Sequence, residues 1–194
     1  MLGNEAGRII YDGDIIIGQH GHLIAVNKRL SFRRFNVVGT EVNLDDPTQS
    51  QIQVSTDIKE KHEELAQAVS LGLFDYLRKS KAGGFVLSLS GGADSSSCAV
   101  MVAEMVKRAS SELGWKDFNA ALGTASTTND WKAAVGQLLT CAYQGTKNSS
   151  TETLNAAREL AGSIGAEFHH WTIDDEVTSY TQKIEKAIGR QLQW

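Results

Sequence analysis

The sequence lacks most of the features that mark secreted, membrane-spanning or nucleic-acid-binding proteins. It has only two cysteines and no Cys-x-x-Cys pair, which disfavours a disulfide framework, a zinc site and thiol-transfer chemistry. No run of about 18 apolar residues is present, so we expect no membrane span. The N-terminus has no basic region followed by an apolar core, so no signal peptide is visible. The net charge is −4 and no basic run occurs, which disfavours a nucleic-acid partner.

The composition favours a globular protein of modest size. The chain has 194 residues, of which 41% are apolar, enough for one ordinary domain or for a domain with a piece of another. We expect Cys98 in a helix and Cys141 in a strand, both as buried reduced thiols of a cytoplasmic protein.

The stretch from Phe85 to Ser95 carries the clearest pattern. A short apolar run over residues 85–89 lies between two glycine pairs, which predicts a buried strand. After Ser95 the apolar residues recur at helical spacing, which predicts a helix. These apolar residues are Cys98, Met101, Val102, Met105 and Val106.

A strand, a glycine turn and a helix N-terminus together predict an anion site. Glycines let the backbone approach a ligand closely, and the first helical N–H groups point at it with the positive end of the helix dipole behind them. Hydroxyls of Ser90, Ser95 and Ser96 add donors, so a phosphate or pyrophosphate is the expected ligand. A carboxylate beside phosphate repels it unless a cation lies between them, so Asp94 is a candidate Mg²⁺ ligand. The alternative is a simple turn capped by Asp94 or Ser95.

Neither a G-x-x-x-x-G-K-[ST] nor a G-x-G-x-x-G motif is present. The segment Ser90-Gly91-Gly92-Ala93-Asp94-Ser95 instead resembles the pyrophosphate loop of N-type ATP pyrophosphatases, which split ATP into AMP and pyrophosphate. The resemblance implies an adenine nucleotide α-hydrolase-like fold and an ATP site. Its residues would be Ser88, Leu89, Ser90, Gly91, Gly92, Ala93, Asp94 and Ser95.

Residues 9–44 predict β structure, with strands at 9–11, 15–17 and 23–26. Asp12-Gly13 and residues 19–22 are turn signals between apolar runs, and residues 36–44 alternate as a further strand. His20 and His22 flank the turn glycine and are expected as exposed turn residues. Residues 4–13, 17–19 and 33–46 resemble the last strands of a nitrilase-like α/β glutaminase domain, whose catalytic residues cannot be placed here.

The remaining chain predicts alternating helices and strands. A polar linker over residues 47–58 precedes an amphipathic helix. Residues 110–134 form an insertion with an exposed loop at 123–130. Two further strands are expected at 137–144 and 168–173. Asp174-Asp175 would cap a last helix through Ile188. The order β-α-β-α-β-α predicts a doubly wound parallel sheet with ligands at the carboxyl ends of the strands. There, residues 143–144 and 88–89 would border the adenosine.

A second loop, over residues 145–150, lies at the same expected edge of the sheet. Its Lys147, Asn148, Ser149 and Ser150 are possible ligand contacts, or the serines only close a helix through a Ser149-x-x-Glu152 capping box. Residues 145–150, Glu152-Thr153 and residues 157–161 resemble the same element of glutamine-dependent NAD⁺ synthetases.

This resemblance implies three parts: a glutaminase tail over residues 1–46, the linker, and the first part of an ATP-pyrophosphatase domain over residues 59–194. It implies ATP and Mg²⁺, with deamido-NAD⁺ and ammonia from glutamine as substrates of a longer, homo-oligomeric enzyme. Another pyrophosphate-loop enzyme, such as a GMP synthetase-like ligase, and a non-catalytic nucleotide-binding fragment are the alternatives. Only three strands are predicted after Gly84, so we expect an uncovered sheet face and an incomplete synthetase in this chain alone. We also expect no glutamine hydrolysis, because neither Cys98 nor Cys141 lies where a glutaminase nucleophile belongs.

Overall fold

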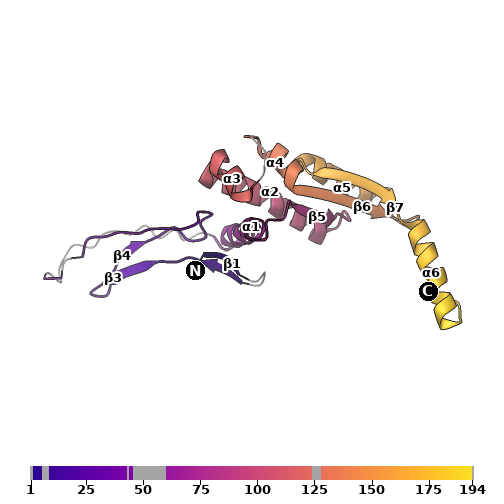
Figure 1. Ribbon diagram of the computed structural model, residues 1–194, viewed down its shortest axis with the longest axis horizontal. Helices are drawn as coiled ribbons and strands as arrows, with labels where there is room; N and C mark the ends of the chain where they lie inside the picture. Colours follow the sequence, from indigo (N-terminus) through magenta and orange to yellow (C-terminus); the bar gives the residue numbers. More distant parts are fainter. Residues whose placement is uncertain (1, 6–8, 43, 46–59, 124–127, 194) are drawn as a thin grey trace. The chain divides into compact units, whose positions relative to one another are not determined.

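The computed structural model describes residues 2–5, 9–42, 44–45, 60–123 and 128–193 (Figure 1). The chain forms two compact units. Unit 1 contains residues 1–83 and 101–131, and unit 2 contains residues 84–100 and 132–194. Helix α2 (Ala93–Leu113) begins in unit 2 and ends in unit 1. The predicted linker over residues 47–58 lies outside the described residues.

Unit 1 begins with two antiparallel strand pairs. Strand β1 (Leu2–Glu5) pairs with β2 (Ile9–Asp12), and β3 (Ile16–Gln19) pairs with β4 (His22–Val26). The turn between β3 and β4 has positive φ at His20 (49°) and Gly21 (82°), which suits a two-residue hairpin. Strands predicted at 9–11, 15–17 and 23–26 correspond to β2, β3 and β4, whereas β1 was not predicted.

The strand predicted over residues 36–44 is wrong for the residues described there. Residues 36–42 are irregular, and Val37 and Val42 are 84% and 45% exposed. An alternating apolar pattern needs a neighbouring strand and a core face. None of the described strands pairs with this segment.

An aromatic cluster forms the core of unit 1. Helix α1 (Lys61–Ser80) places Phe74 between Phe32 and Phe118, with ring centroids 5.5 Å and 6.0 Å away. Phe118 lies on α3 (Trp115–Leu122), which is followed by α4 (Trp131–Leu138). Residues 110–134, predicted as an insertion, therefore include the end of α2, all of α3 and the start of α4, and Phe118 gives α3 a core contact. The described part of the predicted loop, residues 123 and 128–130, is irregular as expected.

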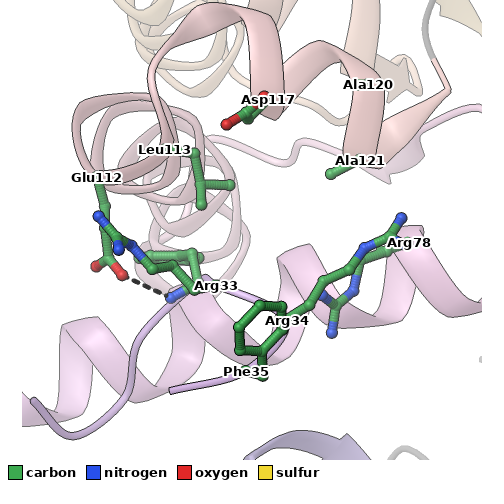
Figure 2. A pocket seen from close by; sticks show the side chains of 10 residues that line it. Arg33, Arg34, Phe35, Arg78, Glu112, Leu113, Asp117, Ala120 and Ala121 are labelled. Atoms are coloured by element: carbon green, nitrogen blue, oxygen red, sulfur yellow. Dashed lines mark hydrogen bonds between the residues drawn. The ribbon is translucent and has the colours of Figure 1, made fainter. Parts of the chain in front are cut away.

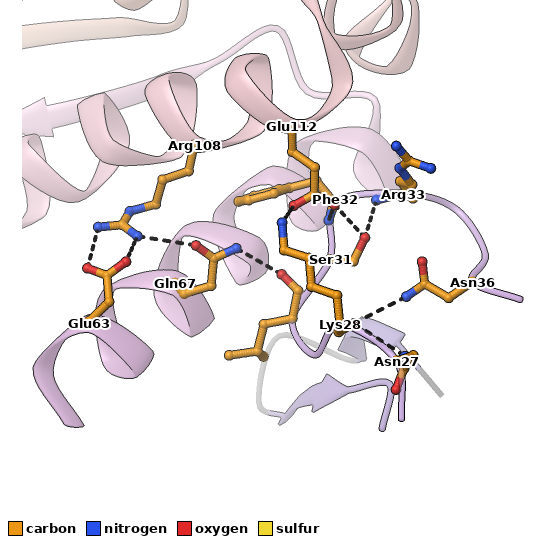
Figure 3. A network of polar contacts seen from close by, with 11 residues as sticks. Asn27, Lys28, Ser31, Phe32, Arg33, Asn36, Glu63, Gln67, Arg108 and Glu112 are labelled. Atoms are coloured by element: carbon orange, nitrogen blue, oxygen red, sulfur yellow. Dashed lines mark hydrogen bonds and ion pairs between the residues drawn. The ribbon is translucent and has the colours of Figure 1, made fainter. Parts of the chain in front are cut away.

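A buried polar contact joins α1 to α2 within unit 1 (Figure 3). The Arg108 guanidinium donates to both carboxylate oxygens of Glu63 at 2.5 and 3.0 Å and to Gln67 Oε1 at 3.2 Å. The buried Gln67 side chain then donates to the Leu30 carbonyl at 2.9 Å. The hydrogen bond to Glu63 is the main cause that raises the pKa of Arg108.

Glu112 holds the segment after β4 in the same way (Figure 3). Its carboxylate receives Lys28 Nζ at 2.7 Å, Ser31 Oγ at 2.5 Å and the Phe32 amide at 3.1 Å. Three donors on one mostly buried carboxylate satisfy it fully, so the N-terminal strands of unit 1 are fixed to its helices by specific bonds.

Unit 2 is built on a parallel sheet. Strands β5 (Phe85–Ser88), β6 (Leu139–Gly145) and β7 (Glu167–Thr172) lie in that order, with Leu87, Cys141 and Phe168 in register. Helix α5 (Thr151–Ile164) contacts β6 and β7 (Figure 1), and α6 (Asp174–Ile188) follows β7. The predicted β-α-β-α-β-α order is confirmed, although residues 137–138 belong to α4 and β6 begins at Leu139.

One face of the sheet in unit 2 is exposed to solvent, as expected. Val86 on β5 is 83% exposed and Trp171 on β7 is 43% exposed. The face with Leu139, Cys141 and Tyr143 is instead buried. The sheet therefore has a single covered face in the described chain.

The two cysteines differ in burial. Cys141 lies in the core of the sheet, and burial raises the pKa of its thiol to about 11. Cys98 is exposed, so the prediction that both are buried is wrong. The buried stripe of α2 instead runs through Ala99, Val102, Ala103 and Val106, at helical spacing from one another.

Candidate functional site

The predicted phosphate loop lies where β5 ends and α2 begins. The Leu89 amide donates to the Ala142 carbonyl at 2.9 Å, which extends the sheet pairing by one residue before the chain turns. The Leu89 side chain is buried, so this residue can border a ligand only through its backbone. Gly91 has φ +80°, a conformation that residues with a Cβ rarely adopt.

The first turn of α2 offers free backbone donors. The Ser96 amide donates to the Gly92 carbonyl at 3.1 Å and makes the first helical hydrogen bond. The amides of residues 93–95 precede it and have no intrahelical acceptor, as at any helix N-terminus. These amides and the helix dipole together favour an anion at this point.

Hydrogen bonds of the Ser90 and Ser95 hydroxyls hold the conformation of the loop. The Ser90 amide donates to Ser95 Oγ at 3.2 Å, and the two Oγ atoms lie 3.0 Å apart. The Gly92 amide donates to Ser90 Oγ at 3.3 Å, while Ser95 Oγ donates to the Gly92 carbonyl at 3.3 Å. The loop is therefore preorganised by its own serines.

Asp94 lies in the first turn of α2, with its side chain exposed. No group of three or more His, Cys, Asp or Glu side chains suited to a metal occurs among the residues that the structure describes. Mg²⁺ needs no such group, because it is commonly held by one or two carboxylates together with substrate phosphates. One exposed carboxylate beside free helix amides fits such a shared site.

The second loop connects β6 to α5. Ser150 is the N-cap of α5, and its side chain accepts from the Thr153 amide at 3.2 Å. Ser149 Oγ instead accepts from the Thr146 amide at 2.9 Å, so the capping box predicted from Ser149 to Glu152 is wrong by one residue. Both serine side chains accept hydrogen bonds from nearby backbone amides. This favours the interpretation that they close the start of the helix over the one in which they contact a ligand.

A third segment at the same edge of the sheet fixes this loop. The Lys147 amide donates to both oxygens of Asp174, at 3.2 and 3.1 Å, and the Ile173 amide donates to the Gly145 carbonyl at 2.9 Å. Ile173 is the N-cap of α6, so the predicted capping role of Asp174 for its own helix is wrong. The Asp174 carboxylate contacts the neighbouring loop instead.

The two loops meet at Gly91. A Cβ on Gly91 would lie 2.9 Å from the carbonyl carbon of Thr153 and would overlap its oxygen. The prediction that residues 90–95 and 145–150 share one edge of the sheet is thus supported by a contact between Gly91 and the first turn of α5. The residues that make this junction, Thr153 and Asp174, were not predicted. Only the three-residue spacing from Ser150 to Thr153 could have indicated the first.

Other predicted positions are placed as follows. Ser88 Oγ donates to Gln144 Oε1 at 3.5 Å, so these residues lie together at the strand ends. Tyr143 is only 5% exposed, so its side chain faces the core. His20 and His22 are exposed at the β3–β4 turn, as expected. None of the described helices is both long and apolar enough to span a membrane.

Unit 1 contains a separate cavity of about 510 Å³ (Figure 2). It includes none of the residues predicted for the phosphate site. Its lining comes from the segment after β4, from α1 and from the end of α2 through α3. The residues are Phe32, Arg33, Arg34, Phe35, Arg78, Glu112, Leu113, Asp117, Ala120 and Ala121.

Two solved structures are similar to this chain. A glutamine-dependent NAD(+) synthetase from Cytophaga hutchinsonii is 43% identical with a TM-score of 0.84, and the match covers 100% of this chain and 33% of that one. The glutamine-dependent NAD+ synthetase from Acinetobacter baumannii, solved with adenosine diphosphate, is 19% identical with a TM-score of 0.53, over 74% of this chain and 22% of that one. The second likeness shows a shared fold.

Sequence relatives agree with the structural match. The glutamine-dependent NAD(+) synthetases of Macaca fascicularis and Homo sapiens are each 28% identical over 237 residues, covering 98% of this chain and 34% of theirs. The chain therefore spans about a third of the length of the curated relatives that it matches. A family model described as NAD synthase matches residues 65–193. This match takes in the strand–loop–helix of the phosphate site and well over half of the sequence, so the chain belongs to the NAD synthase family.

Proposed function

We propose that this chain forms the ATP-binding part of a longer glutamine-dependent NAD⁺ synthetase. The observation that carries the proposal is the loop between β5 and α2. Its Gly91 has φ +80° and is followed by free helix amides beside an exposed Asp94. Membership of the NAD synthase family supports the choice of ATP as the adenylyl donor.

The loop residues have distinct roles in this proposal. Backbone amides of Gly91, Gly92 and the residues that follow hold the ATP phosphates, because helix N-terminal amides are suited to phosphate oxygens. Ser90 and Ser95 keep the loop in its binding shape through their mutual hydrogen bonds. Asp94 holds Mg²⁺ together with the phosphates. Lys147 carries a positive charge in the neighbouring loop and contacts the nucleotide from the side of β6.

The reaction is an amidation in two steps. A carboxylate oxygen of deamido-NAD⁺ attacks the α-phosphorus of ATP, and pyrophosphate leaves as an acyl adenylate forms. Ammonia from glutamine then attacks the carbonyl carbon, AMP leaves, and the nitrogen loses a proton to give the amide of NAD⁺. The loop contributes by holding the departing pyrophosphate and aligning the α-phosphate with the carboxylate.

The remaining predictions from the resemblance belong to the longer enzyme. They are a glutaminase tail over residues 1–46, a synthetase part over residues 59–194, homo-oligomeric assembly and a cytoplasmic location. A GMP synthetase-like specificity is disfavoured by the NAD synthase match over residues 65–193. A nucleotide-binding chain without catalysis is the alternative that experiment must separate.

A chimeric enzyme tests the proposal directly. This chain would replace the matched third of the Cytophaga hutchinsonii synthetase, which aligns with all of it at 43% identity. We expect the chimera to form NAD⁺ from ATP, deamido-NAD⁺ and glutamine, and the same chimera with Asp94→Ala to lose most of that activity. A chimera that has the oligomeric state and melting temperature of the parent but forms no NAD⁺ would refute the proposal.

A further inference from the structure

Thr153 lies behind the phosphate loop without being part of it. It belongs to the first turn of α5, and its backbone carbonyl is the group against which Gly91 packs. The contact is so close that only a glycine fits opposite it. The position of this carbonyl therefore sets the position of the loop backbone between Ser90 and Gly92.

The Thr153 side chain is itself held by an unusual number of bonds for an exposed threonine. Its hydroxyl donates to the Ser150 carbonyl at 2.9 Å and lies 2.8 Å from the Tyr143 hydroxyl and 3.2 Å from Ser150 Oγ. Because the single Thr153 hydroxyl proton goes to the Ser150 carbonyl, the Tyr143 hydroxyl is the donor in the bond between them. Tyr143 is buried in β6 and rests edge-on against the His170 ring, with centroids 5.7 Å apart.

These contacts make a continuous path from the sheet to the loop. A rigid residue of β6 holds the Thr153 hydroxyl, and the Thr153 carbonyl supports Gly91. Among the residues that the structure describes, the hydrogen bonds of the Ser90 and Ser95 side chains join these serines to one another and to the loop backbone, so they fix the shape of the loop but not its place in the unit.

We infer that Thr153 is a positioning residue for phosphate binding, acting through Gly91 and anchored by Tyr143. This inference rests on the proposed function, because it assigns the support of the ATP site. Preorganised donors bind phosphate well only when their positions are fixed before the ligand arrives. Loss of the Thr153 hydroxyl frees the first turn of α5, and Gly91 with it. The adenosine part of the ligand has no such dependence.

The test compares four substitutions in the full chain. Thr153→Val keeps the shape of the side chain and removes its hydroxyl, whereas Thr153→Ser restores the hydroxyl. Thr151→Val is the matched control, because Thr151 is an exposed threonine in the same helical turn. Tyr143→Phe removes the other end of the key hydrogen bond while leaving a ring in the core.

Two readouts separate positioning from general stability. Hydrogen exchange of the amides of residues 91–96, measured without ligand, reports the loop itself. Binding of Mg²⁺-pyrophosphate, Mg²⁺-ATP and adenosine reports the site. For Thr153→Val and Tyr143→Phe we expect faster exchange and about threefold to tenfold weaker binding of both phosphate ligands, the scale of one hydrogen bond. Adenosine binding should not change in Thr153→Val, and Thr153→Ser and Thr151→Val should behave as the unaltered chain.

The outcomes distinguish this inference from the proposed function. Unchanged exchange in residues 91–96 of Thr153→Val would overturn the positioning role, whether or not the chain binds ATP. An equal loss of adenosine and pyrophosphate binding would also overturn it, because it would indicate a general structural role. An unaltered chain that binds neither Mg²⁺-ATP nor Mg²⁺-pyrophosphate would instead refute the proposed function, and the exchange measurement would still decide the role of Thr153.

Discussion

Alanine substitutions at the two adjacent glycines of the predicted phosphate loop should differ in their effects on stability. Gly91 has φ +80°, and its added Cβ would overlap the backbone of Thr153. Gly92 has no such constraint, since a Cβ there would meet only Ser90 Oγ at 3.4 Å, an ordinary contact distance. Comparison of the two variants therefore distinguishes Gly91, a glycine that the fold requires, from Gly92, which the fold allows to change.

The loss of stability expected for Gly91→Ala follows from the backbone conformation at Gly91. A residue with a Cβ in a left-handed conformation costs about 1–2 kcal/mol, and the overlap with Thr153 adds to this because backbone atoms must move. For a chain of this length, each kcal/mol lowers the melting temperature by about 2–4 °C. We therefore expect Gly91→Ala to melt at least about 4 °C below the unaltered chain and Gly92→Ala to melt within about 1 °C of it.

Thermal unfolding followed by circular dichroism without nucleotide measures both variants. Titration with Mg²⁺-ATP then adds a second comparison, because a Cβ on Gly92 obstructs close approach of phosphate even where stability is unchanged. We expect weaker nucleotide binding in both variants. A melting temperature for Gly91→Ala equal to that of Gly92→Ala would contradict the packing of Gly91 against Thr153.

Four further outcomes are expected. Asp94→Ala should weaken Mg²⁺-dependent ATP binding at least tenfold, since a charged contact is worth ~1.5–3 kcal/mol, and unchanged affinity in a folded variant by calorimetry would remove the metal role. At pH 8 a thiol reagent should label the exposed Cys98 quickly and Cys141 only on unfolding. Because the Cys141 pKa is raised from 9.0 to about 11, this thiol should lower the free energy of unfolding as pH rises from about 9 to 11, an effect that Cys141→Ala should abolish in pH-dependent denaturation. The chain should release no ammonia from glutamine, and glutaminase activity that Cys98→Ser abolishes would contradict this.

The order of elements in unit 2 could be predicted because each carries a local signal. The apolar runs of β5 and β6 lie beside glycines, and α5 ends at Gly165, whose φ of +80° suits the left-handed helix end. The exposed face of the sheet could also be predicted, because the three strands expected after Gly84 indicated an incomplete sheet. Its side chains are Val86 and Trp171 among others.

The errors arose where tertiary contacts override local pattern. Helix α3 is only eight residues long and depends on Phe118, which packs on Phe74 from a distant part of the sequence. Residues 36–42 alternate like a strand but have none of the described strands beside them. Cys98 has apolar spacing with the α2 core, yet Ala99 occupies the buried stripe.

The local geometry of the candidate site could be predicted, but the contacts that support it could not. Residues 90–95 form the expected turn between β5 and α2, because glycine, serine and aspartate act there through local backbone geometry. Thr153 and Asp174 act across loops that are distant in sequence, through a carbonyl contact and a bond to the Lys147 amide. No spacing rule predicts such contacts before the strands are placed side by side.

Titration of the ¹⁵N-labelled chain with Mg²⁺-ATP, followed by amide chemical shifts, tests most directly whether the β5–α2 loop is the nucleotide phosphate site. We predict saturable shifts in the amides of Gly91, Gly92 and residues 94–96, reproduced by Mg²⁺-pyrophosphate and absent for the 91–96 amides with adenosine alone. The same titration of Asp94→Ala should need much higher ligand concentrations. Saturable shifts confined to the cavity of unit 1, around residues 32–35 and 113–121, or no shifts with any phosphate ligand, would contradict the assignment of the loop as the ATP site.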